Sequence, residues 1–159
     1  MAWDNMNDEQ LKASLWINVT EEMGVTAEGI ALAIHLKDKG TFTAEDFEEA
    51  QSLVDDEDYL VLTDEQADER CKEEIEEMVW AFTPSFLQAH TGVDADAIKK
   101  IQEMCEGANE PLTAMIKDFD WFVEDAVRCD GRGHFLAGYD HEENEVTYNG
   151  TTYYIYRRN

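Results

Sequence analysis

Acidic side chains are the residues of this chain whose number and spacing could do chemistry. The 159-residue sequence has 37 Asp and Glu against 12 Lys and Arg, and its formal net charge is −25. Sixteen of the 33 residues from Glu45 to Glu77 are acidic, and Arg70 and Lys72 are the only basic residues among them. Carboxylates at this density attract basic proteins and repel nucleic acids and anionic membranes. The sequence therefore predicts a basic protein partner, with no direct binding of nucleic acid or membrane.

The acids that follow Thr63 recur on one face of an expected helix. TDEQ at 63–66 is a capping box, which marks the start of that helix. At 100° per residue, five acids fall opposite a stripe made of Ala67, Cys71, Ile75, Met78, Val79 and Phe82. Their like-charge pairs at i,i+4 cost roughly 0.2–0.5 kcal/mol each. Together with the acids that precede them, they form the expected partner-binding set: Glu45, Asp46, Glu48, Glu49, Asp55, Asp56, Asp58, Glu65, Glu69, Glu73, Glu76 and Glu77.

The total charge is comparable to that of a short DNA duplex. B-DNA carries one charge per roughly 1.7 Å of axis, so about 25 charges correspond to about 42 Å of duplex. A compact domain of this length is roughly 40 Å across. One interpretation is therefore a DNA mimic that occupies the basic groove of a DNA-binding host protein. One alternative is a structural or regulatory protein that binds its partner through an apolar or hairpin surface, while its acids only keep it soluble. Another is adaptation to high salt.

Other chemistries have weaker sequence support. The acids at 56 and 58 lack the central glycine of a calcium-binding loop, and the four histidines are not spaced with the cysteines as zinc ligands. We expect no metal, no cofactor and no catalytic residues. A small enzyme between Cys129 and Asp140 remains an alternative, because CDGRGH places Cys129 five residues before His134. Arg132 and Arg157 either pair with local carboxylates such as Asp140 or Glu143, or contribute to a ligand pocket near the end of the chain.

The elements that must position these residues are mainly helical. Apolar periodicity and capping residues predict helices over 8–23, 43–54, 63–82, 84–90, 94–107 and 109–127. The segment 30–36 fits a strand or a helix, and its composition favours the helix. DGRGH is expected to form a turn, and the alternating pattern around Asn149-Gly150 predicts a β-hairpin packed against the last helices. The fold class is α+β, mainly helical with a C-terminal β-hairpin.

Composition sets the domain organisation and the expected compartment. Hydrophobic residues make up 43% of the chain, which suffices for a core. A change in composition near 55–62 suggests a small helical unit at 1–58 and a larger domain at 59–159, or one continuous domain. Cys71, Cys105 and Cys129 form no CxxC pair and are expected to be buried free thiols in a reducing compartment. The absence of a leader pattern and of a long apolar run predicts a soluble cytoplasmic protein.

Four segments carry a family resemblance from about Tyr59 to the end of the chain. They read LVLTDEQADERCKEEIEEMVWAF, IQEMCEGANEPL, DGRGHFLAGYDHEENEV and YYIYRRN. In these segments the chain resembles a group of acidic proteins encoded by tailed bacteriophages and prophages. The resemblance implies an accessory protein that acts in the bacterial cytoplasm during infection, and it supplies no catalytic residues. By analogy alone, it also suggests the acidic mimics that block restriction or CRISPR nucleases.

Overall fold

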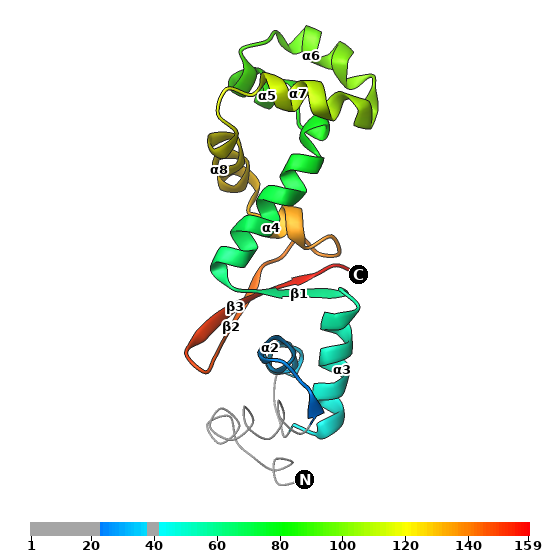
Figure 1. Ribbon diagram of the computed structural model, residues 1–159, viewed down its shortest axis with the longest axis vertical. Coiled ribbons are helices and arrows are strands. Elements are labelled where there is room, and N and C mark those ends of the chain that lie inside the picture. Colours follow the sequence, from blue (N-terminus) through cyan, green and yellow to red (C-terminus); the bar gives the residue numbers. More distant parts are fainter. Residues whose placement is uncertain (1–22, 38–41) are drawn as a thin grey trace.

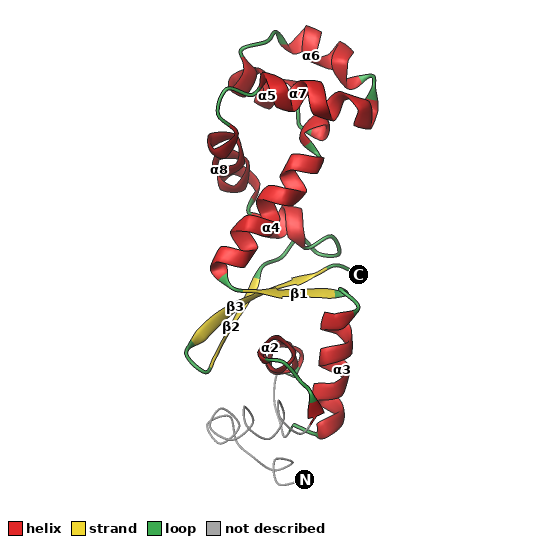
Figure 2. Ribbon diagram, viewed as in Figure 1, coloured by secondary structure: helices red, strands yellow, loops and turns green. Residues whose placement is uncertain are grey.

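The computed structural model describes residues 23–37 and 42–159. They form a mainly helical α+β fold with a C-terminal hairpin, as the sequence predicted (Figures 1 and 2). The expected helix over 8–23 lies outside the described residues except for its last residue. None of the described helices is long and apolar enough to cross a membrane.

A three-stranded antiparallel sheet crosses the middle of the molecule. Its strands are β1 (Tyr59–Leu62), β2 (Asn144–Tyr148) and β3 (Thr151–Arg157), in the order β1-β3-β2. Asn149 and Gly150 connect β2 to β3 with φ angles of 50° and 79°, the left-handed conformation that an Asn-Gly hairpin turn requires. The predicted hairpin is thus confirmed, and the YLVL segment adds a third strand beside β3.

The two faces of the sheet belong to different hydrophobic cores. Side chains alternate between faces along a strand, so Val61 and Ile155 join one core, whereas Leu60 and Tyr156 join the other. We expected the hairpin to pack against the last helices. It does contact the late helix α9 (Arg132–Leu136), but β2 and β3 also pack on a helix from the start of the described chain. A domain boundary at residue 58 stays a prediction.

The first core contains α2 (Ala27–Leu36) and α3 (Ala44–Asp55), which lie on one side of the sheet (Figure 1). The favoured helical interpretation of residues 30–36 is correct, and Thr26 caps α2 by accepting a hydrogen bond from the Gly29 amide. A capping box between Thr43 and Asp46 begins α3. The acids of the expected binding set that precede β1 therefore sit on α3 and the turn that follows it.

The second core lies on the opposite side and contains the remaining helices. They are α4 (Asp64–Glu77), α5 (Pro84–Thr91), α6 (Ala95–Gln102), α7 (Asn109–Met115), α8 (Phe119–Asp130) and α9, with 3₁₀ turns at Val79–Ala81 and Cys105–Ala108. Phe82, Phe86 and Phe122 pack together there, with ring centroids 5.0–5.3 Å apart. This aromatic cluster connects α5 and α8 to Phe82, which follows the 3₁₀ turn after α4.

The predicted helix over 63–82 starts where expected but ends at Glu77. Thr63 and Gln66 form the capping box at its start, and Met78 leaves the helical conformation with φ −123° and ψ 22°. Asn109 replaces the missing helical bonds, because its side chain donates to the Glu76 carbonyl (2.8 Å) and accepts from the Trp80 amide (3.1 Å). The end of α4 is therefore stabilised by Asn109, a residue that is distant from it in the sequence.

Three other expectations were wrong in detail. The helix predicted over 109–127 is broken after Met115, because Asp118 is extended and its side chain caps α8 at the Trp121 amide. The helix predicted over 94–107 ends at Gln102, and Cys105 has φ 53°. Within DGRGH, Gly131 caps the end of α8 with φ 81°, as expected of a C-cap, but Arg132, Gly133 and His134 begin α9 instead of forming a turn. A Cβ on Gly133 would come within 2.6 Å of the His141 carbonyl oxygen.

The cysteines also differ from the prediction. Cys71 is buried on the inner face of α4, and burial raises the pKa of its thiol to about 12. Cys105 and Cys129 are exposed: Cys105 begins the 3₁₀ turn that follows α6, and Cys129 lies in the last turn of α8. All three are free thiols.

Candidate acidic binding surface

The outer side of α4 carries a row of unpaired carboxylates. Ala67, Cys71 and Ile75 are fully buried, as the predicted stripe requires. The acids on the opposite side are all exposed, and none has an ion pair or a side-chain hydrogen bond to another described residue. We call this set the α4 surface: Glu65, Glu69, Glu73, Glu76 and Glu77.

The cations around α4 are engaged with other acids. Arg70 bonds Glu74 across one helical turn (3.2 Å), and Arg158 bonds the same carboxylate from the C-terminus (3.3 Å). Lys72 reaches Asp120 on α8 (2.7 Å). Each of these contacts neutralises acids outside the α4 surface. In the described part of the chain no acid of the α4 surface is therefore in an ion pair, although Lys72 lies close enough to interact electrostatically with Glu76.

Arg132 is the most connected cation in the described structure. Its side chain, only 11% exposed, bonds Asp64 (2.9 Å), Asp68 (3.0 Å) and Glu143 (2.9 Å). The guanidinium also lies 4.6 Å from the centre of the Tyr154 ring. Burial alone would lower the pKa of Arg132, but its hydrogen bonds to Glu143 and Asp64 outweigh burial and raise it. Of the carboxylates expected to pair with Arg132, Glu143 does so.

Glu143 continues this network into the second core. Tyr156 donates a hydrogen bond to the Glu143 carboxylate at 2.6 Å. Burial and this hydrogen bond together raise the pKa of Tyr156. Arg132 and its partners thus join α4, α9, β3 and the loop before β2. This arrangement is structural, and it leaves Arg132 unavailable to a ligand.

The acids of α3 form a second, separate surface. Glu45, Glu48 and Glu49 are exposed and unpaired among the described residues, and we call them the α3 surface. Because α3 and α4 pack on opposite sides of the sheet, the structure does not join this surface to the α4 surface (Figure 1). The predicted binding set is therefore divided in two.

Several members of the predicted set already have partners. Asp46 caps α3 and bonds Lys37 at 2.7 Å. Burial alone would raise the pKa of Asp46, but the bond to Lys37 outweighs burial and lowers it. Asp55 accepts from Gln51, Asp56 accepts weakly from Ser52, and Asp58 accepts from Asn159. These contacts stabilise α3 and the start of β1. They make these four acids weaker candidates for a partner than the α4 surface.

A groove between α4 and α8 adds acids that sequence analysis missed. We call it the α4/α8 groove, and its volume is about 800 Å³. Besides Glu65 and Glu69 it includes Asp68 of α4 and two acids of α8, Asp120 and Glu124. The i,i+4 spacing of Asp120 and Glu124 was a visible signal, but their position across from α4 depends on tertiary packing.

The alternative catalytic residues lie near one another without a bond between them. Cys129 and His134 both line a pocket of about 320 Å³ beside Phe82 and Phe86. Cys129 contacts an Asp125 oxygen at 3.9 Å, and His134 stacks against His141. No hydrogen bond joins the Cys129 thiol to the His134 ring. The pair therefore lacks the nucleophile–base contact that the enzyme alternative needs.

Metal binding and similarity to other proteins give no further assignment. Among residues 23–37 and 42–159, no group of His, Cys, Asp and Glu is arranged to hold a metal ion. Comparison of the chain with protein-family models, with curated proteins and with solved structures gave no match. The α4 surface and the groove beside it are thus the best candidate site on their own geometry.

Proposed function

We propose that the protein is an acidic binding protein that uses the α4 surface to occupy the basic nucleic-acid groove of a DNA-binding protein, which it inhibits as a DNA mimic. The observation that supports this most is that Lys72, the cation that lies among these acids on α4, forms its ion pair with Asp120 of α8 rather than with an acid of the α4 surface. Arg70, Lys72 and Arg132 lie nearby, but all three bond acids outside the α4 surface. Repulsion among the acids of the α4 surface is therefore not relieved by an ion pair to any of these three cations. An Arg- and Lys-lined groove would supply that missing counter-charge.

The charge density of α4 is compatible with such a role when α8 is included. Acids at i,i+4 recur about every 6 Å along a helix, whereas one DNA strand carries a charge about every 3.4 Å of axis. A single row therefore has about half the charge density of one strand. Glu76 beside the row and Glu124 across the groove bring the local density closer to that of DNA, whereas Lys72 neutralises Asp120.

The resemblance to acidic bacteriophage proteins supplies the proposed context. A small phage protein that blocks a host defence or DNA-handling protein would act in the bacterial cytoplasm. Its partner would be a basic protein, and no metal or cofactor would be needed for competition. The proposed mechanism is occupancy of the groove rather than chemistry.

Affinity capture from a bacterial lysate, followed by mass spectrometry, tests the proposal. The bait is the full chain, compared with a variant in which Glu69, Glu73 and Glu77 are replaced by Gln. A matched variant, with Gln at Glu45, Glu48 and Glu49, carries the same change in charge on the α3 surface. We expect DNA-binding proteins to be captured at about 50 mM salt and lost at about 200 mM, because exposed charge pairs are screened.

The two variants separate site-specific binding from general acidity. The α4 variant should lose the captured proteins, and the α3 variant should retain them. Equal capture by all three proteins, or capture that is indifferent to salt, would contradict the proposal and favour a solubilising role for the acids.

A further inference from the structure

The α4/α8 groove combines an apolar floor with acidic walls. Val123 and Val127 of α8 provide the floor, and both are only half-buried. The walls carry the carboxylates of Glu65, Asp68 and Glu69 from α4, and of Asp120 and Glu124 from α8. The two helices lie beside each other in Figure 1. The groove therefore offers apolar contact and negative charge in the same place.

Two cations, Lys72 and Arg128, already line this groove. The Lys72 ammonium is 2.7 Å from an Asp120 oxygen and 6.0 Å from the centre of the Phe119 ring. At the groove's edge, Arg128 lies 5.4 Å from the centre of the Trp121 ring and bonds Asp125. Carboxylates paired with aromatic faces are thus the means by which this region holds cationic side chains.

The groove has more carboxylates than the cations of the chain pair with. Lys72 is taken by Asp120, Arg128 by Asp125, and Asp68 is bonded to Arg132. Glu65, Glu69 and Glu124 have no partner among the described residues, although they surround the valine floor. The groove therefore has unused acceptors for cations and an uncovered apolar strip.

We propose that the α4/α8 groove receives an amphipathic cationic segment of the protein partner, with Arg or Lys head groups on Glu65, Glu69 and Glu124 and aliphatic groups on the valine floor. This inference rests on the proposed function and names the part of the partner that enters. A simple metal ion would leave the floor exposed, and an anion would be repelled by the walls. An Arg or Lys side chain suits both features, since its stem is apolar and its head is charged.

Two labelled peptides test the groove directly. One is helical, with Arg on one face and Leu on the other, and the second has Ser in place of every Leu. We expect the Arg/Leu peptide to bind more tightly by fluorescence anisotropy at about 50 mM salt, because only it can cover Val123 and Val127. Methyl NMR signals of these two valines should shift on binding.

Matched variants then locate the binding. Replacing Glu65, Glu69 and Glu124 with Gln should raise the Kd of the Arg/Leu peptide by about tenfold or more. The same replacement at Glu45, Glu48 and Glu49 should change it by less than about twofold. A single Val127→Thr change should weaken the Arg/Leu peptide and leave the Arg/Ser peptide unaffected, with circular dichroism confirming the fold.

Failure of the groove can be distinguished from failure of the proposed function. Salt-sensitive binding that both triple variants weaken equally would overturn the groove and leave the broader electrostatic role standing. No binding of either peptide at low salt would overturn both.

Discussion

Arg132 forms ion pairs with several acids, which are therefore less available to a protein partner. It bonds Asp64 and Asp68 near the start of α4, and Glu143 before β2. These acids are therefore structural, whereas the α4 surface keeps its charge. A single well-placed cation thus separates acids that stabilise the fold from acids available for binding.

Arg132→Gln should lower the free energy of unfolding by about 2–4 kcal/mol. The reason is that Glu143, which is also bonded to Tyr156 of the second core, would lose its charged partner. Urea unfolding followed by fluorescence measures the effect. Lys99→Gln is the matched control, because Lys99 is exposed without an ion pair in the described structure and its loss changes the net charge equally. A loss no larger than in the control would contradict the structural role of Arg132.

The bonds of Asp125 lead us to expect that the stability of the fold depends on pH. Hydrogen bonds from His90 (2.7 Å) and Arg128 lower the pKa of Asp125 below its ordinary 3.8. A lowered folded-state pKa stabilises the fold above about pH 4, and this stabilisation is lost as the pH falls through the folded-state pKa. Asp125→Asn should therefore lower Tm at pH 7, and the difference from wild type should shrink toward pH 3.

Asp130→Asn is the control for this pH experiment, because Asp130 is exposed on the same helix without a bonded partner among the described residues. Its Tm should follow that of the wild type at every pH. A wild-type advantage over Asp125→Asn that stays constant down to pH 3 would exclude the ionised Asp125 carboxylate as its source.

Some residue roles were visible in the sequence and others were not. The periodicity of α4 predicted that Cys71 would be buried and that Glu69 and Glu73 would be exposed, because a helix places alternate faces in different surroundings. The partners of Arg132 on α4 are 64 and 68 residues away in sequence. No local pattern encodes such a contact, so the sequence could not show which acids would be neutralised.

Repulsion between neighbouring acids on α4 lowers the stability of the helix, and removing it tests whether these acids serve binding. Glu73 faces Glu69 and Glu77 at i,i+4, and both neighbours are exposed. Glu73→Lys replaces two like-charge pairs with two opposite-charge pairs and places a cation nearer the C-terminal end of the helix. We expect the free energy of unfolding to rise by about 0.5–1 kcal/mol while binding to the captured partner weakens.

Glu142→Lys is a suitable control for this prediction. Glu142 lies in an exposed loop outside the helices, and the change alters the net charge by the same amount. If Glu73→Lys raises the free energy of unfolding no more than this control does, repulsion among the acids of α4 does not destabilise the helix. If binding is unchanged, α4 does not contribute to the interface.

Local signals predicted element starts better than element ends. Capping residues located the beginnings of α3 and α4, because the bonds that they form join residues only three apart. The end of α4 depends on Asn109, and the break before α8 coincides with a bond from the Lys117 amide to the His90 carbonyl oxygen (3.1 Å). Both features depend on tertiary contacts, so periodicity extended these helices too far.

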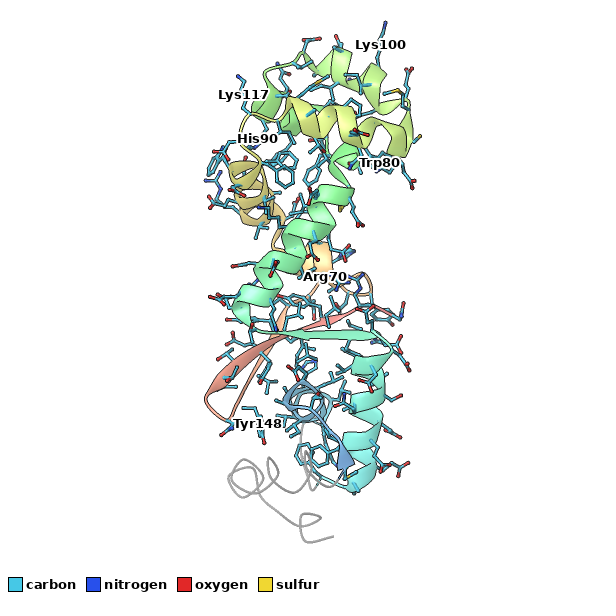
Figure 3. All side chains as sticks on the ribbon, viewed as in Figure 1. Arg70, Trp80, His90, Lys100, Lys117 and Tyr148 are labelled. Atoms are coloured by element: carbon cyan, nitrogen blue, oxygen red, sulfur yellow. The ribbon has the colours of Figure 1, made fainter. Side chains whose placement is uncertain are left out.

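The molecule as a whole distributes its charge unevenly. Most acids between Glu45 and Glu77 lie on α3 and α4, on the two sides of the sheet, and the rest lie in the turn before β1. Lys100 and Lys117, in contrast, lie toward the end of the molecule farthest from α2 and α3 (Figure 3). The net charge of −25 is thus presented as separate acidic surfaces. The proposed binding role requires one of them, the α4 surface, to meet a basic groove.

Competition with DNA tests this claim most directly. A captured DNA-binding protein, once purified, is given a fluorescent duplex, and the full chain is then titrated at low salt. We predict that the duplex is released as the protein binds, and that the Gln variant of Glu69, Glu73 and Glu77 releases it only at much higher concentration. A stable ternary complex of partner, duplex and acidic protein would contradict the account.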